Sequence, residues 1–287
     1  MKKWLSMFGL MIVTVIWGGG FVASDMALDS MRPFQILTIR FGLATLLMGL
    51  VSMKSLKGIT KAEIKAGALM GLALFAGFAF QIIGLQYTTP SKNAFLTALN
   101  VVMVPFIAFV ILKKKVGIKG IIGAVLSVSG VAVLSLNGDL TLSLGDALTL
   151  LCAVGFAFQI FLTGEFVKNN RVGALNFVQM ATAFLLSAGS LFVAGETDFV
   201  VSTSGILSVL YLGVVSTTLC YLIQTACQQY VDETKSAIIL SMESVFGTLF
   251  SIWILHEVVT LRMLLGCGII FVAVLIANAP TKEETDV

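Results

Sequence analysis

Residues 81–123 read QIIGLQYTTPSKNAFLTALNVVMVPFIAFVILKKKVGIKGIIG, and residues 224–266 read QTACQQYVDETKSAIILSMESVFGTLFSIWILHEVVTLRMLLG. A shift of 143 positions (Tyr230 minus Tyr87) brings the two stretches into one register. Polar residues then coincide: Gln81 with Gln224, Gln86 with Gln229, Tyr87 with Tyr230 and Lys92 with Lys235. Small and apolar residues continue the match: Ala94 with Ala237, Val102 with Val245, Leu112 with Leu255, Val116 with Val259 and Gly123 with Gly266. Abundant valine and leucine explain part of the apolar agreement, but the polar matches indicate an internal repeat.

The composition predicts a membrane protein. Of 287 residues, 58% are hydrophobic and 11% are charged, and the mean hydropathy is +1.02. Soluble domains contain about 25% charged residues, so this chain has too little polar surface for water to be its main solvent. Apolar runs of about 20 residues without strict alternation are typical of membrane-spanning helices rather than barrel strands.

The apolar runs predict ten helices, separated by charge and turn residues. Pro33, Pro90 and Pro280 are expected at helix ends, where a missing N–H is harmless, whereas Pro105 is expected to kink the fourth helix. The predicted spans are 4–24, 34–53, 64–86, 93–112, 118–136, 145–167, 172–194, 204–228, 235–255 and 261–279.

The repeat unit contains five of these spans, an odd number, so the second copy must enter the membrane from the opposite side. The sequence therefore predicts two inverted five-helix repeats, residues 1–137 and 138–280, followed by a short tail at 281–287. In such proteins a binding site lies between the halves near the middle of the membrane, and the two halves allow inward-open and outward-open states.

Lysine and arginine positions predict the orientation in the cell inner (plasma) membrane. With the N-terminus inside, fourteen cations fall on the cytoplasmic side, and only Arg32, Lys92 and Arg262 fall outside. Basic loops resist translocation, so both termini are expected in the cytoplasm. The lysine cluster at 113–115 is then a topology signal beside anionic lipid headgroups, and no nucleic-acid partner is predicted.

Several motifs resemble the EamA-type members of the drug/metabolite transporter superfamily. They are Trp17-Gly18 with Phe21, Gln86-Tyr87-Thr88 leading to Lys92-Asn93-Ala94, Gly145-Asp146-Ala147, and the run LSMESVF…ILHEVVTLRMLLGCGIIF. The resemblance covers about residues 8–279 and implies a ten-helix secondary carrier, often an exporter of amino acids and other metabolites. Two departures stand out: Ser244 replaces the proline that commonly follows this family's glutamate at position 243, and Lys113–Lys115 replace an acidic residue at the end of the fourth helix.

Two ionisable residues, Arg40 and Glu243, fall well inside predicted spans. A charge at such depth is costly and faces a partner or a wet cavity. In one interpretation Glu243 binds a proton or the ammonium group of a substrate. In the other, Glu243 forms a static pair with Arg40 or hydrogen bonds with Ser241 or Ser244, and only orients helices. Asn100 is the repeat partner of Glu243 and adds a neutral polar group at the same depth.

The candidate substrate-binding set combines these polar groups with nearby aromatic rings and amides, which suit a zwitterion or an amphipathic metabolite. For any single aromatic residue, packing against lipid or another helix is the competing interpretation. The set is Trp17, Arg40, Phe78, Gln81, Asn100, Phe156, Gln159, Tyr221, Gln224 and Glu243.

No cofactor or metal is predicted, because the four cysteines lack metal-ligand spacing and a lone histidine, His256, makes no site. The chain has no P-loop and no hydrolase signature, so an ATP-driven pump of that type and an enzyme are both disfavoured. The leading hypothesis is a secondary transporter that exports amino acids or related metabolites by alternating access. A multidrug or cationic-compound exporter is the alternative, a non-transporting scaffold is a third class, and assembly as a homodimer is left open.

Overall fold

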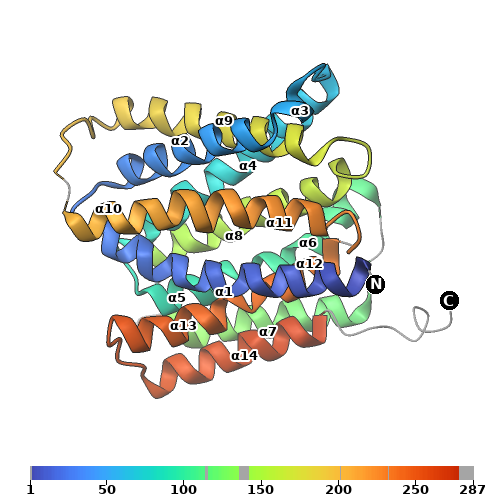
Figure 1. Cartoon of the computed structure of the whole chain (residues 1–287). Coiled ribbons are helices and arrows are strands. Elements are labelled where there is room, and N and C mark those ends of the chain that lie inside the picture. Colours follow the sequence, from blue (N-terminus) through green and yellow to red (C-terminus); the bar gives the residue numbers. More distant parts are fainter. Residues whose placement is uncertain (1, 114–115, 136–141, 201, 232, 278–287) are drawn as a thin grey trace.

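The computed structural model describes residues 2–113, 116–135, 142–200, 202–231 and 233–277. The regular elements in these ranges are helices that lie side by side along one common direction, and turns at the two ends of the bundle connect them (Figure 1). In chain order they are α1 (Lys2–Leu28), α2 (Pro33–Val51), α3 (Met53–Leu56), α4 (Lys61–Leu85), α5 (Pro90–Thr97), α6 (Asn100–Leu112), α7 (Ile118–Ser135), α8 (Leu144–Phe166), α9 (Val172–Val193), α10 (Thr203–Leu210), η1 (Tyr211–Leu219), α11 (Cys220–Cys227), α12 (Glu233–Ser241), α13 (Glu243–Ile254) and α14 (Leu261–Ala277).

Eight helical stretches in the described ranges are long and apolar enough to cross a membrane. Three of them join consecutive elements: Pro90–Leu112, Thr203–Cys227 and Lys235–Ile254. The predicted spans at 118–136 and 261–279 coincide with α7 and α14, which contain shorter apolar stretches, Ile118–Val133 and Leu261–Ile276.

The outer surface of the bundle is suited to lipid. Phe192, Val193 and Trp253 are 71%, 91% and 74% exposed. Large exposed apolar side chains of this kind are unfavourable in water, whereas a hydrocarbon solvent accommodates them.

Prolines and polar caps begin several helices. Pro33 and Pro90 are the first residues of α2 and α5, which confirms their predicted place at helix ends, while Pro280 lies outside the described residues. Thr60 and Glu63 cap α4 reciprocally, since the Thr60 hydroxyl accepts from the Glu63 N–H and the Glu63 carboxylate accepts from the Thr60 N–H. Donors that would otherwise be unpaired are thereby satisfied.

Two of the predicted helices are interrupted in the middle. The fourth is interrupted at Ala98 and Leu99, between α5 and α6, and Pro105 lies inside α6. The ninth is interrupted at Met242, between α12 and α13. In the register of the repeat, Pro105 of the first half corresponds to Thr248 of the second. Proline is therefore not the common cause of the two turns.

The two interruptions share one backbone geometry. Leu99 has φ −62° and ψ −16°, and Met242 has φ −62° and ψ −14°. The N–H groups of Val102 and Val245 bond carbonyls three residues back, so each interruption is one tight helical turn. As a result, Asn100 and Glu243 each become the first residue of a new helix.

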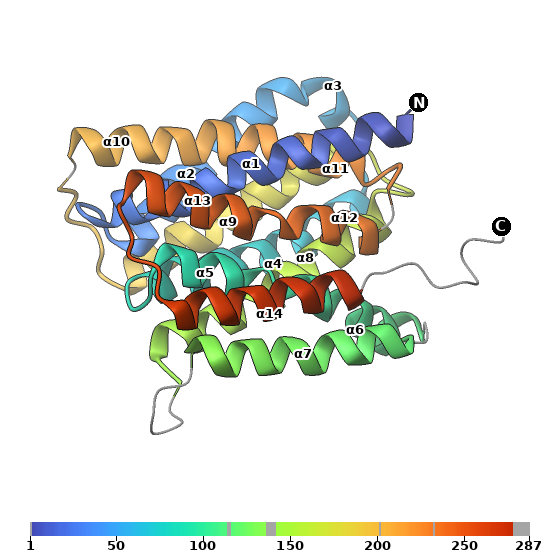
Figure 2. The same ribbon diagram turned by 90° about the horizontal axis from the view of Figure 1, so that it is seen from below.

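Helices from the two ends of the sequence interleave. α1 packs on η1, α11 and α13, whereas α8 packs on α4, α5 and α6. α2 lies against α9, and α7 pairs with α14 along one side of the bundle (Figure 2). At the contact of α1 with α13, a Cβ on Gly18 would stand 2.5 Å from the Phe246 Cβ, so this close approach requires glycine.

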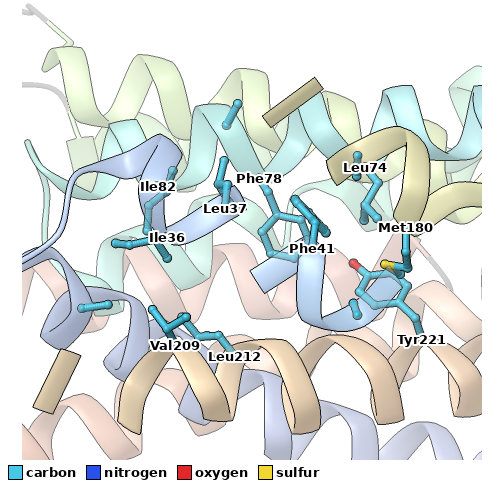
Figure 3. Close-up of a cluster of buried hydrophobic side chains, with 14 of the residues drawn as sticks. Ile36, Leu37, Phe41, Leu74, Phe78, Ile82, Met180, Val209, Leu212 and Tyr221 are labelled. Carbon is cyan, nitrogen blue, oxygen red and sulfur yellow. The ribbon is translucent and has the colours of Figure 1, made fainter. Parts of the chain in front are cut away.

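The largest group of buried apolar side chains lies between α2, α4, α9 and the stretch from α10 to α11 (Figure 3). Ile36, Leu37 and Ile82 fill the part toward the beginning of α2, and Phe41, Phe78 and Tyr221 continue toward the middle of the bundle. The aromatic end of this core borders a cavity.

Candidate functional site

A cavity lies in the middle of the bundle, and the centre of a water-sized molecule can move within about 40 Å³ of it. The lining comes from α1, α2, α4, α6, α8, η1, α11, α12 and α13: Trp17, Gly20, Phe21, Ser24, Arg40, Phe78, Gln81, Asn100, Phe156, Gln159, Ile160, Ser216, Tyr221, Leu240 and Glu243. Side chains that are far apart in the sequence therefore face one space.

Nine of the ten residues in the predicted binding set line this cavity, and Gln224 does not. The Gln224 side chain is fully buried behind the wall, where its Nε2 donates to the Gln159 Oε1 at 3.4 Å. The sequence prediction missed six lining residues: Gly20, Phe21, Ser24, Ile160, Ser216 and Leu240. Helical spacing from Trp17 could have found the three on α1, because they follow it by three, four and seven positions.

Aromatic rings form one wall of the cavity. The Phe78 ring stands edge-on to the Phe156 ring, with centroids 4.8 Å apart, and the Trp17 and Tyr221 centroids are 5.2 Å apart. Phe41 supports Phe78 from behind, at 5.5 Å between centroids (Figure 3). Edge-to-face pairs of this kind fix ring orientation, so the wall is preformed.

Arg40 is held on this wall by polar and aromatic contacts. Its Nε donates to the Thr217 Oγ1 at 2.6 Å and its Nη2 to the Ser216 Oγ at 3.4 Å. The guanidinium carbon, Cζ, lies 3.9 Å from the centroid of the Phe78 ring, a cation–π arrangement. Among the described residues, no carboxylate forms an ion pair with this arginine, so its positive charge faces the cavity.

Glu243 contributes the opposite charge from α13. The residue is 6% exposed, and no described residue donates a hydrogen bond or an ion pair to its carboxylate. The proposed static pair with Arg40 is not formed. The hydroxyls of Ser241 and Ser244 donate instead to the carbonyls of Ile238 and Ser241. The nearby serine hydroxyls therefore bond backbone carbonyls and not the Glu243 carboxylate, which faces the cavity.

Asn100 occupies on α6 the place that Glu243 has on α13. Both residues directly follow a tight turn and both line the cavity. The Asn100 Oδ1 is buried and has no partner among the described residues. The cavity therefore presents one anionic and one neutral polar group from equivalent helix positions.

The stretch η1 is wound as a π-helix, in which N–H groups bond carbonyls five residues back. The Cys220 N–H donates to the carbonyls of Val215 and Thr217, and the Ser216 carbonyl loses the partner that an α-helix would give it. That carbonyl accepts instead from the Trp17 Nε1 at 2.8 Å. The wider winding thus places Ser216 and Thr217 against two cavity residues, Trp17 and Arg40.

Each end of the bundle carries an ion pair between the first and second halves of the sequence. At one end, the Lys92 Nζ lies 2.7 Å from the Asp146 Oδ2. At the other, Arg171 Nε and Nη2 donate to the two oxygens of Glu63, each at 2.7 Å. These hydrogen bonds raise the pKa of Arg171 above its ordinary value, so the contact stays ionised. The cavity lies between the two ends of the bundle at which these ion pairs connect the halves of the sequence.

None of the four cysteines, nor His256, is among the residues that line the cavity. Cys152, Cys220, Cys227 and Cys267 are buried free thiols, and His256 is exposed with φ 55°. The part of the chain that the structure describes has no group of three His, Cys, Asp or Glu able to hold a metal ion. The polar part of the cavity lining thus consists of two charged residues, three amides and hydroxyl groups, beside the aromatic rings.

Comparison with known proteins gives a consistent result along the whole chain. The model of the EamA-like transporter family matches twice, at residues 4–136 and 143–279. An uncharacterized transporter of Archaeoglobus fulgidus is 34% identical over 277 residues, which are 96% of this chain and 87% of that protein. The uncharacterized transporter YoaV of Bacillus subtilis is 22% identical and covers 92% of this chain and 94% of its own length.

The fold also has a solved counterpart. A crystal structure with 15% identical sequence superposes with a TM-score of 0.71 and covers 95% of this chain and 96% of the other. At that identity the likeness establishes the fold alone.

Proposed function

This chain belongs to the EamA-like transporter family and is a multi-pass membrane transporter, and we propose that its solutes are amino acids or related zwitterionic metabolites, exported across the inner membrane by alternating access. One observation carries the choice of solute: Arg40 and Glu243 present opposite charges to one cavity without pairing with each other. A solute with a carboxylate and an ammonium group satisfies both, and the solute then replaces the missing ion pair.

The cavity lining supports a small zwitterion with an apolar side chain. The Arg40 guanidinium is pre-oriented by Thr217 and Phe78 and offers its remaining N–H groups to a carboxylate. Glu243 accepts from an ammonium group, and the rings of Trp17 and Phe156 provide apolar area.

We further propose that the protein spans the membrane ten times, as two inverted repeats at 1–137 and 138–280, with a tail at 281–287 and both termini in the cytoplasm. The double match of the family model supports this arrangement, and so do the equivalent turns at Leu99 and Met242. The two ion pairs at the ends of the bundle would then open in turn, as one side of the cavity or the other becomes accessible.

Glu243 is also the proposed proton-coupling residue. Its carboxylate is the one acidic group in the cavity lining, so a proton and a substrate ammonium group compete for it. In an exporter, entry of a proton from outside releases the solute, and loss of the proton to the cytoplasm restores the binding state.

A cationic-compound exporter is the second candidate, because five aromatic rings line the cavity that holds the Glu243 carboxylate: Trp17, Phe21, Phe78, Phe156 and Tyr221. Rings and a carboxylate together bind organic cations. Arg40 separates the two hypotheses, since its positive charge repels a cation and attracts the carboxylate of a zwitterion.

The test is counterflow into proteoliposomes over a panel of radiolabelled amino acids, amines, organic cations and sugars. We expect amino-acid flux, loss of this flux in Arg40→Gln and Glu243→Gln, and retention in the surface control Glu165→Gln. Flux driven by a pH gradient should disappear in Glu243→Gln. Flux of organic cations that survives Arg40→Gln favours the second candidate, and no flux of any compound by folded protein contradicts both.

A further inference from the structure

A group of buried amide and hydroxyl side chains extends from the cavity between α8, α9 and α11. Each of its members is at most 4% exposed. It begins at Gln159, which lines the cavity, and reaches Gln228, the residue that follows the last residue of α11. We call it the amide cluster: Gln159, Asn176, Gln179, Gln224, Thr225 and Gln228.

The amide cluster is connected by hydrogen bonds across three helices. The Gln159 Nε2 donates to the Gln179 Oε1 at 3.1 Å, and the Gln179 Nε2 donates to the Asn176 Oδ1 at 3.5 Å. From α11, the Thr225 Oγ1 donates to the same Asn176 oxygen at 3.0 Å. Gln228 is separate from these bonds, since its Nε2 donates to the Ile160 carbonyl at 3.4 Å, and it lies next to Cys227, which packs against Gly9 near the beginning of α1.

Three polar atoms of the cluster are buried without a partner among the residues that the structure describes: the Asn176 Nδ2, the Gln224 Oε1 and the Gln228 Oε1. One is a donor and two are acceptors. A buried polar atom without a partner is costly, by about 1–3 kcal/mol. Water fits this set, because a buried water molecule both donates and accepts and forms about three hydrogen bonds.

The fold does not require polar side chains at these positions. In the register of the repeat, Ile82 and Leu85 on α4 correspond to Thr225 and Gln228 on α11. Both are apolar and 3% exposed, and Ile82 belongs to the core of Figure 3. Gln224 keeps its polar counterpart Gln81, but apolar packing suffices at the other two positions, so packing alone does not require the polar side chains of Thr225 and Gln228.

We propose that the amide cluster binds a chain of internal water molecules and forms a hydrated passage from the cavity to the end of the bundle where α1 begins. The water molecules bond the three unpartnered atoms and one another. In the orientation proposed above, the passage opens toward the cytoplasm, and it supplies Glu243 with the hydrogen-bonded path along which a proton leaves. The hydration itself is independent of which solute is carried.

Silver ion, a thiol-reactive cation close to water in size, tests the passage without any transport assay. In a background with all four cysteines changed to alanine, Thr225→Cys and Gln228→Cys place single thiols in the cluster. Ile82→Cys and Leu85→Cys are matched controls at equivalent helix positions, where the native side chains are 3% exposed against 0% and 4% for Thr225 and Gln228. Captured thiols are counted by mass spectrometry, as those protected from N-ethylmaleimide after denaturation.

We expect the cluster thiols to capture silver at least about tenfold faster than the control thiols. In sealed inverted vesicles, we expect this capture only when silver is added on the side of the membrane where α1 begins. Capture as slow as that of Ile82→Cys overturns the proposal, and so does capture from the opposite side alone. Size-exclusion profiles that match the parent protein show that each variant is folded. Because the readout is labelling, the passage can fail while the proposed solute stands, and the converse also holds.

Discussion

The helix α4 and the stretch Thr203–Cys227 have the same length, 25 residues, and the same mean hydropathy, yet they are built differently. α4 is a regular α-helix from Lys61 to Leu85, whereas Thr203–Cys227 contains the π-wound segment η1. Both contribute to the cavity. α4 does so with side chains, Phe78 and Gln81, and η1 also presents main-chain and hydroxyl groups at Ser216.

The difference shows that the winding of a helix decides which polar groups a cavity receives. An α-helix closes its carbonyls on its own N–H groups, so α4 can offer only what its side chains carry. The π-wound segment releases the Ser216 carbonyl for Trp17 and turns the Ser216 and Thr217 hydroxyls toward Arg40. π-helical segments are often found at functional sites for this reason.

Deleting Val214 is expected to have the largest effect. The deletion removes the additional residue of the wide turn, so the segment returns to α-helical winding, and Trp17 and Arg40 lose their partners. Counterflow should fall to background while the protein still inserts, because 24 helical residues span about 36 Å. Val214→Ala keeps the residue count and should transport normally. If the variant that lacks Val214 transports at the parent rate, the π-helical winding of η1 is not needed for transport.

Arg40→Lys should raise the KM for amino-acid transport about tenfold. The amount of folded protein should stay unchanged. Lysine keeps the charge but lacks the planar fork that bonds Thr217 and stacks on Phe78, so the cation is no longer pre-oriented. Concentration dependence of amino-acid counterflow measures the effect. The exposed Arg262 offers the matched control, and an equal rise in KM for Arg262→Lys would show that the contacts on η1 are irrelevant.

Thr217→Val should raise the dissociation constant of the transported amino acid about threefold to fivefold, because it removes one hydrogen bond to the Arg40 Nε and preserves shape. Thr217→Ser keeps the oxygen and should restore most of the affinity. The comparison is made by equilibrium binding of the transported amino acid to purified protein. Equal loss in both variants would point to the methyl group rather than to the hydrogen bond.

Trp17→Phe should lower stability by about 1 kcal/mol, because the Ser216 carbonyl then loses the donor that compensates for π winding. The melting temperature of detergent-solubilised protein reports the change. Trp253→Phe, at an exposed position, is the control and should leave the melting temperature unaltered. A larger loss in the control variant would sink the assignment of this hydrogen bond.

Much of the fold could be predicted from hydropathy and proline positions. Spans such as 64–86 and 204–228 agree closely with α4 and with Thr203–Cys227, because helix length follows membrane thickness and apolar runs are visible in the sequence. The interruption at Leu99 could not be predicted, since Pro105 is the only local breaker in that run and it lies inside α6. Tight turns without proline depend on tertiary packing, which a single sequence does not reveal.

The same limit applies to the cavity. Nine of the ten candidates share one space because mid-span polar and aromatic residues are rare enough to be recognised. Ser216 was missed, because a serine in a regular helix carries no signal, and only π winding brings it to Arg40. A pair of Arg40 with Glu243 was one of the alternatives that the sequence left open, and it is not formed, because the Thr217 hydroxyl on η1 binds the arginine.

The placement of Trp17 has a spectroscopic consequence. The chain has three tryptophans, and two of them, Trp4 and Trp253, are exposed on the lipid-suited surface, while Trp17 lines the cavity. Brominated acyl chains should quench the emission of the first two and leave that of the third. The remaining fluorescence would then come from one indole whose N–H is engaged by a serine carbonyl, and its wavelength would follow the polarity of whatever enters beside it.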